Sequence, residues 1–258
     1  MNILITAGGT TEKIDSVRSI SNFSTGKLGS LIAARFAAEP AVDKIFYLCG
    51  TAALIPPSEK VEALHAGSVS DLAAAIQQVL AQTSVDIIVH AMAVSDYRVK
   101  TVTTAARLAD SIVTDLEAAK PLGSEAAAST VVSAIKNAAP AVGGDGKIRS
   151  DVDDMLLMME RTPKIIALFQ ALSPQSTLVG FKLLDHAPLD ALIDAGFQVL
   201  TQNKCSFVLA NDLRDVSSQD AHVGYLIDKE KHYTRYAGKT VIADAIVSAT
   251  MNERRNRC

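Results

Sequence analysis

The chain has 258 residues, 48% of them hydrophobic and 21% charged, so it can bury a substantial core in one large domain or two small ones. Its formal net charge of −3 and its lack of tryptophan give no support for a nucleic-acid surface. No apolar run approaches the roughly 20 residues that span a bilayer, and the three cysteines have neither metal-binding nor disulfide spacing. We therefore expect a reduced, cytoplasmic protein that binds neither nucleic acid nor membrane.

The first third of the chain alternates between strand and helix patterns. Residues 2–6 form a short apolar run that ends at Gly8 and Gly9, which is typical of a buried parallel strand. Helix, strand, helix and strand patterns follow in turn, at residues 27–39, 44–50, 68–83 and 85–94. Ser70 or Asp71 is the expected cap of the second helix. This alternation predicts an α/β fold with a mostly parallel, Rossmann-like sheet flanked by helices.

Residues 100–146 differ from the rest in being rich in Ala, Ser and Thr. Two helical patterns lie within them, at 104–119 and 124–139, and a glycine-rich stretch closes them. A bare loop of this length is improbable in a compact domain. We expect a helical insertion within a single domain of residues 1–258.

The remainder of the chain completes the predicted sheet. Helices are expected at residues 164–172, 188–204 and 238–255. Buried strands are expected at residues 176–184 and 205–212, and a terminal hairpin at 222–237.

Two glycine-bearing segments suit an anion. Gly8 and Gly9 at a strand end let the backbone turn and bring N–H groups near a ligand. Gly26 and Gly29 lie in "SNFSTGKLG", where polar side chains precede the free N–H groups of a helix. The pattern is neither GxGxxG nor GxxxxGK[ST], and purely structural glycines and an ordinary helix cap are the alternatives. One cap does not account for Gly9, Gly26 and Gly29 together, so we favour a phosphate site.

Later strand ends carry further candidates. Asp96 follows the third strand, where a carboxylate either holds Mg²⁺ or caps a turn. His90 lies inside that strand and is expected to be buried and hydrogen-bonded. Lys147, two residues before Arg149, either clamps a phosphate or carboxylate or lies free in solvent. Phe181 either stacks on a base or fills the core.

As a set, these segments resemble the phosphopantothenate–cysteine ligase family. The family hallmark stands here as "TAGGTTEKIDSVRSISNFSTGKLG", with Thr25 in place of the usual second Ser. Later family blocks follow in order: "AVSDYRV", Lys147-Ile148, "TPKII", "VGF", "LAND" and "GKTVIADAI". Only Lys147 of the family's "K-x-K-K" is retained, because the segment here is "KIRS".

The resemblance implies a two-step ligation in coenzyme A biosynthesis. The carboxylate of 4′-phosphopantothenate attacks the α-phosphate of CTP and expels pyrophosphate, and the amino group of cysteine then attacks the acyl-cytidylate. Mg²⁺ or Mn²⁺ would assist. The chain is similar to the stand-alone bacterial kind, so a separate phosphopantothenoylcysteine decarboxylase would act next. A homodimer is implied as well, with the segment between "DYR" and "TP" crossing to the partner.

The resemblance also implies roles for individual residues. The catalytic residues would be Asn22, which handles the acyl-nucleotide, its neighbour Arg18, and Lys147 in the second step. Asp96 would be the metal-associated residue. The nucleotide-binding residues would be Gly8, Gly9, Ser24, Gly26, Gly29, Ala91, Met92, Ala93, Asp96, Pro163, Lys164, Ile165, Ile166, Phe181 and Lys204.

Two other classes of protein use the same type of sheet. An NAD(P)-dependent oxidoreductase would want GxGxxG and an acidic residue after the second strand, and the chain has neither there. A non-catalytic nucleotide-binding protein is the second alternative, and the many polar residues at strand ends speak against it.

Overall fold

The computed structural model describes residues 1–119, 123–140, 146–215 and 222–257. The chain divides into two compact units. Unit 1 comprises residues 1–11, 21–95 and 163–258, and unit 2 comprises residues 12–20 and 96–162. Each unit has its own secondary structure, and we describe them in turn.

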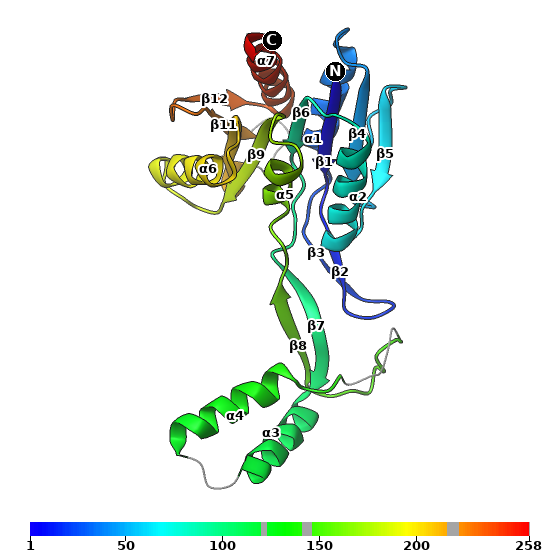
Figure 1. Ribbon diagram of the computed structural model, residues 1–258, viewed down its shortest axis with the longest axis vertical. Coiled ribbons are helices and arrows are strands. Elements are labelled where there is room, and N and C mark those ends of the chain that lie inside the picture. Colours follow the sequence, from blue (N-terminus) through cyan, green and yellow to red (C-terminus); the bar gives the residue numbers. More distant parts are fainter. Residues whose placement is uncertain (120–122, 141–145, 216–221, 258) are drawn as a thin grey trace. The chain divides into compact units, whose positions relative to one another are not determined.

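Unit 1 is built on an eight-stranded sheet. Its strands are β1 (Asn2–Ala7), β4 (Lys44–Cys49), β5 (Val61–His65), β6 (Ile87–His90), β9 (Thr177–Leu184), β10 (Phe207–Asp212), β11 (Val223–Ile227) and β12 (Tyr233–Ala237). They are ordered β12-β11-β10-β9-β6-β1-β4-β5 (Figure 1). All neighbouring strands from β10 to β5 pair in parallel, whereas β11 pairs antiparallel with both β10 and β12. The predicted Rossmann-like, mostly parallel sheet is confirmed.

Helices cover both faces of this sheet. They are α1 (Lys27–Ala38), α2 (Val69–Gln82), α5 (Ile165–Leu172), α6 (Leu189–Asn203) and α7 (Lys239–Arg257), and a short 3₁₀ turn, η1 (Leu213–Asp215), follows β10. Side chains alternate along β1, so Ile3 and Ile5 join the core under α1 and α7 while Leu4 joins the core under α2, α5 and α6. In the part of the chain that the structure describes, no helix is long and apolar enough to cross a membrane.

Two details of unit 1 differ from the sequence-based expectation. Strand β5 is not predicted, because this short edge strand has a half-exposed rather than an apolar pattern. The cap of α2 is Ser68, not Ser70 or Asp71. The Ser68 hydroxyl accepts the Asp71 N–H at 3.1 Å, and the Asp71 carboxylate accepts the Ser68 N–H at 2.9 Å, which makes a reciprocal capping box.

Two cysteines lie deep in unit 1. Cys49 ends β4 and Cys205 precedes β10, and both are free and buried. Burial raises the pKa of both thiols, and that of Cys205 rises to about 12. Both thiols are therefore protonated at neutral pH.

Unit 2 consists of an antiparallel ribbon and a helical hairpin. Strand β7 (Tyr97–Thr104) pairs with β8 (Met155–Arg161), and α3 (Ala105–Ala119) and α4 (Ser124–Lys136) follow β7. The two helices confirm the predicted helical patterns, whereas β7 is an additional strand that crosses the expected start of the insertion at residue 100. A short pair of strands, β2 (Thr11–Lys13) and β3 (Ser19–Ser21), flanks the turn of residues 14–18.

Gly29 lets α1 approach the sheet closely. A Cβ at this position would lie only 2.6 Å from the Cβ of Ala7 on β1. Carbon atoms that are not bonded to each other do not approach this closely, so a side chain here would force the helix away from the strand.

We expect Gly29→Ala to lower the free energy of unfolding by about 1–3 kcal/mol, because the added methyl group overpacks the contact between α1 and β1. Urea denaturation followed by circular dichroism measures this change. Gly123→Ala is the matched control, since no atom lies within 4 Å of its added Cβ. Equal stabilities of the two variants would contradict the close packing of α1.

Candidate functional site

Three backbone segments of unit 1 meet where β1 and β4 end. A Cβ on Gly9 would lie 2.1 Å from the carbonyl oxygen of Asn22, and a Cβ on Gly50 would lie 2.4 Å from the carbonyl oxygen of Gly9. Gly8 has a φ of +85°, which favours glycine. Only glycine therefore lets the segment after β1 fit between the other two.

Hydrogen bonds hold Asn22 in this place. Its N–H donates to the Thr10 carbonyl at 3.2 Å, and its Oδ1 accepts from the Ser95 hydroxyl at 3.4 Å. Thr10 is itself fixed, because its N–H donates to the Ala93 carbonyl and its hydroxyl accepts from the Ser95 N–H. Among the described residues, Nδ2 of Asn22 has no partner. The side chain can therefore donate to an oxygen of a ligand.

The first turn of α1 adds a positive pole to this edge of the sheet. The helix begins after Gly26, whose φ of +67° places it in the left-handed region, and no acidic residue lies in its first turn. Ser24 is exposed just before it, and its hydroxyl is 3.4 Å from the Gly26 nitrogen. Free N–H groups, the helix dipole and a hydroxyl are suited to phosphate oxygens.

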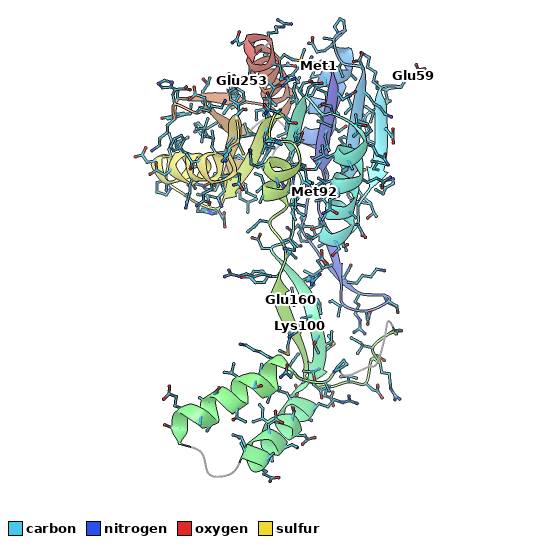
Figure 2. The ribbon with its side chains drawn as sticks, viewed as in Figure 1. Met1, Glu59, Met92, Lys100, Glu160 and Glu253 are labelled. Carbon is cyan, nitrogen blue, oxygen red and sulfur yellow. The ribbon has the colours of Figure 1, made fainter. Side chains whose placement is uncertain are left out.

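The segment after β6 lies beside the glycines. Ala93 donates its N–H to the Gly8 carbonyl at 2.8 Å, and Ala91 donates to the Thr6 carbonyl. Met92 donates to the Thr6 hydroxyl and is buried at the end of the sheet opposite to Met1 (Figure 2). The structure thus brings the three predicted backbone positions to the same edge as Gly8, Gly9 and Asn22.

His90, the last residue of β6, is a core residue. Its Nδ1 lies 2.8 Å from the Thr6 hydroxyl, and its ring meets the ring of Phe169 edge-on. Burial lowers its pKa to about 4, so the ring is neutral at physiological pH. The expectation of a buried, hydrogen-bonded histidine is confirmed.

Helix α5 and β9 contribute the next candidates. Lys164 precedes α5, and Ile165 in its first turn belongs to the same hydrophobic cluster as Met92. Pro163 is exposed there, and Ile166 is half-buried. Phe181 is not at the end of β9, which continues to Leu184. Because Val179 pairs with Val89, Phe181 is level with Ala91, and both pack against the core beneath α1 and α7.

Lys204 is placed elsewhere. It ends α6 with a φ of 50° and lies just before β10, whose first residues pair with the first half of β9. The amino end of a parallel strand lies at the edge of the sheet opposite to its carboxyl end. The structure therefore does not bring Lys204 together with the other nucleotide-binding candidates, and we leave it out of the candidate site.

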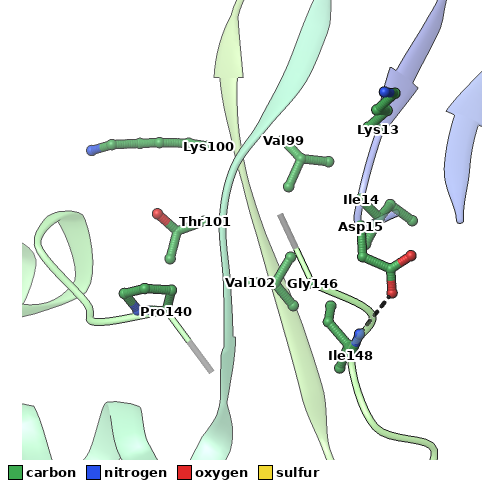
Figure 3. A pocket seen from close by; sticks show the side chains of 10 residues that line it. All are labelled: Lys13, Ile14, Asp15, Val99, Lys100, Thr101, Val102, Pro140, Gly146 and Ile148. Atoms are coloured by element: carbon green, nitrogen blue, oxygen red, sulfur yellow. Dashed lines mark hydrogen bonds between the residues drawn. The ribbon is translucent and has the colours of Figure 1, made fainter. Parts of the chain in front are cut away.

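A second polar cluster belongs to unit 2. The Asp15 carboxylate, whose side chain is 1% exposed, accepts N–H groups from Val17, Arg18 and Ile148 at 2.8, 2.7 and 3.1 Å. The Arg18 guanidinium contacts the same carboxylate at 2.7 Å and donates to the Ile148 carbonyl at 2.7 Å. Figure 3 shows the Asp15 carboxylate turned toward the Ile148 nitrogen, at the wall of a cavity of about 250 Å³.

These donors keep Asp15 ionised. The Val17 N–H, followed by the other N–H groups and the guanidinium, outweighs desolvation and holds the pKa of Asp15 well below its ordinary value. Because the folded pKa is lowered, the stabilisation from this cluster is present above the ordinary pKa and is lost only as the pH falls through the lowered one. The cluster is therefore intact at neutral pH.

Lys147 directly precedes Ile148, whose backbone is held by Asp15 and Arg18. It is exposed, and it has no hydrogen-bond or ion-pair partner among the described residues. The structure therefore brings Arg18 and the segment of Lys147 together within unit 2. The glycines expected before Lys147, at positions 143 and 144, lie outside the described residues.

Asp96 is the carboxylate predicted to hold a metal. It is exposed directly after Ser95, and its carbonyl accepts the Thr162 N–H at 3.0 Å. Within the described ranges, no group of three or more His, Cys, Asp or Glu side chains gathers to bind a metal. A single carboxylate that shares the ion with substrate phosphates is a usual arrangement for Mg²⁺, so Asp96 fits that ion.

The site residues predicted from the sequence do not include four residues that take part in these clusters: Thr10, Asp15, Gly50 and Ser95. Gly50 and Ser95 each follow a strand that ends at this edge, which is the signal that could have found them. Thr10 and Asp15 belong to the quoted family hallmark. The contacts of Thr10 with Ser95 and of Asp15 with Ile148 join residues far apart in the sequence and could not be read from it.

Comparison with known proteins places the chain in a family. Residues 1–120 and 102–253 match the model described as DNA/pantothenate metabolism flavoprotein C-terminal domain. The crystal structure of the DNA/pantothenate metabolism flavoprotein from Streptococcus pneumoniae superposes with a TM-score of 0.77 at 28% identity, over 98% of this chain and 99% of that one.

Two curated relatives are longer proteins. The coenzyme A biosynthesis bifunctional protein CoaBC of Thermococcus kodakarensis is 30% identical over 223 residues, which cover 86% of this chain and 43% of that protein. The protein of the same name from Mycobacterium tuberculosis is 42% identical over 103 residues, 40% of this chain and 24% of that protein. The chain spans less than half the length of these relatives. Since the family model matches nearly all of its residues, the chain belongs to the DNA/pantothenate metabolism flavoprotein C-terminal domain family.

Proposed function

We propose that this chain joins 4′-phosphopantothenate to cysteine in coenzyme A biosynthesis, with consumption of CTP. The observation that carries the proposal is the fixed Asn22 amide beside Gly9, with Nδ2 free to meet an oxygen. The order of the family motifs along the chain supports it, as do relatives that are named for coenzyme A biosynthesis.

In the first step, the substrate carboxylate attacks the α-phosphate of CTP. Negative charge develops on that phosphorus and on the departing pyrophosphate, so hydrogen-bond donors at this edge lower the barrier. The α1 amino terminus, Ser24 and the glycine backbones would supply those donors, while Ala91, Met92 and Ala93 would face the base. Mg²⁺ held by Asp96 would neutralise part of the phosphate charge.

In the second step, the cysteine amino group attacks the acyl carbon and CMP leaves. An amide at Asn22 can bind the carboxylate first and the acyl oxygen later without adding a charge. Lys147 and Arg18 are cations, which suit the charge that leaves with CMP. A decarboxylase would then act on the product.

Turnover with defined substrates tests the proposal. The protein is incubated with 4′-phosphopantothenate, cysteine, Mg²⁺ and each nucleoside triphosphate, and pyrophosphate and the ligated product are measured. Release of both with CTP is the expected result. A co-purified nicotinamide cofactor without turnover would point to an oxidoreductase, and nucleotide binding without turnover to a non-catalytic protein.

We expect Asn22→Asp to stall the reaction after activation and to slow product formation roughly 100- to 1,000-fold. The change keeps the size of the side chain but places a second negative charge beside the substrate carboxylate. Mass spectrometry should detect acyl-cytidylate accumulating. Asn137→Asp, an exposed change at the end of α4, is the control and should behave as wild type. Full activity of Asn22→Asp would refute its assignment.

We expect Lys147→Ala to slow capture of cysteine by about 100-fold while activation changes little, because this cation is assigned to the second step. Pyrophosphate and product are followed in the same single-turnover reaction. Lys136→Ala, which removes an exposed lysine of α4, controls for loss of charge. An equal fall in the rates of both steps would disprove the division of labour.

We also propose that two copies assemble through β8. The run from Met155 to Met159 is continuously apolar, and Leu156, Leu157 and Met159 are 38%, 38% and 39% exposed. More than a third of each side chain is thus left open by the described residues. Neighbouring side chains of a strand point to opposite faces, so both faces of the ribbon present apolar surface, which is better buried against a partner.

Replacing both Leu157 and Met159 with Asp should therefore yield a monomer by light scattering and abolish turnover together. A charged residue cannot be buried in an apolar interface without a large desolvation cost. Val113→Asp, on the exposed face of α3, is the control from the same unit. A monomeric double variant with full activity would contradict the shared assembly.

A further inference from the structure

Asp15 does more than close the turn in which it lies. Three of its four donors, the N–H groups of Val17 and Arg18 and the Arg18 guanidinium, are within three residues and would satisfy an ordinary turn. The fourth is the Ile148 N–H, which lies 133 residues away in the sequence. A turn of this kind does not require this long-range contact.

The ion pair of Asp15 and Arg18 occupies both backbone polar groups of Ile148. Asp15 takes its N–H, Arg18 donates to its carbonyl, and the two side chains contact each other at 2.7 Å. The peptide planes on both sides of Ile148 are thereby restrained. One of these planes contains the carbonyl group of Lys147, so the backbone position of Lys147 is restrained too.

The side chains of this segment divide into an anchored and an open set. Ile148 is 4% exposed and packs inward, while Lys147 and Arg149 on either side are exposed. Arg149 is already paired with Asp151 at 2.9 Å. Within the described residues 146–151, Lys147 is the cation without a partner. The anchor therefore presents one available ammonium group.

We propose that Asp15 is a positioning residue for the cysteine-capturing step: with Arg18 it clamps the backbone of Ile148 and so fixes where Lys147 is presented. This inference rests on the proposed function. Asp15 does not touch the reacting atoms in this scheme. It acts through Lys147, whose segment it holds together with Arg18, and its loss would misplace a group whose geometry decides the rate.

The first test is the variant Asp15→Asn, which keeps the shape of the side chain but removes its charge. In rapid-quench experiments, decay of the acyl-cytidylate with cysteine should slow roughly 10- to 100-fold, while its formation changes far less. Asp228→Asn is the matched control, since Asp228 accepts the N–H groups of Glu230 and His232 in the β11–β12 turn. Asp228 contacts none of the candidate site residues among the described contacts.

A double variant separates positioning from general structural support. If Asp15 acts through Lys147, then Asp15→Asn combined with Lys147→Ala should be no slower than Lys147→Ala alone. Multiplication of the two effects, an unchanged decay rate in Asp15→Asn, or an equal fall in both chemical steps would overturn the proposal. If Asp15→Asn does not fold, Asp15→Glu, which keeps the charge one methylene further out, takes its place.

Hydrogen exchange provides a readout that does not depend on turnover. Exchange of the Ile148 amide should accelerate in Asp15→Asn and stay unchanged in Asp228→Asn. Slow exchange that persists in Asp15→Asn would disprove the clamp. If the wild-type chain forms no acyl-cytidylate, the proposed function fails, and this measurement still decides whether the clamp exists.

Discussion

The candidate site depends on a contact between three backbones, in which Gly9 lies between Asn22 and Gly50 with no space for a Cβ on either glycine. This contact sets how near the segments after β1 and β4 come to the loop before α1. The hydrogen bonds of Thr10 and Ser95 then fix the Asn22 amide against that surface. Because the backbone N–H and Oδ1 of Asn22 are both held, the side chain loses little entropy when Nδ2 meets a ligand, which is the physical basis of preorganisation.

Both units restrain a segment next to candidate site residues through a buried polar side chain. In unit 1 the Thr10 hydroxyl is fully buried and accepts the Ser95 N–H. In unit 2 the Asp15 carboxylate accepts the Ile148 N–H. The charged group makes the stronger restraint, because hydrogen bonds to ions exceed those between neutral groups.

The sheet and its main helices could be predicted because burial leaves a pattern in the sequence, a continuous apolar run in β1 and a helical spacing of apolar residues in α1. Strands β5 and β7 have half-exposed patterns, and β7 is paired with residues about 55 positions later, so local sequence does not reveal them. Lys204 illustrates a different limit. Its place next to a family motif along the chain suggested proximity to the site, but α6 ends at the opposite edge of the sheet. The contact of Asp15 with Ile148 is set by tertiary folding alone.

The burial of Cys49 and Cys205 has a consequence for a protein proposed to handle free cysteine and an activated acyl group. A thiol becomes a competing nucleophile, or exchanges with a disulfide, only as its thiolate. With both pKa values raised by burial, that of Cys205 to about 12, the thiolate fraction at neutral pH is negligible. These two side chains are thereby insulated from self-acylation and from mixed disulfides, so the core of unit 1 offers no thiolate that would compete with the amino group of cysteine in the proposed reaction.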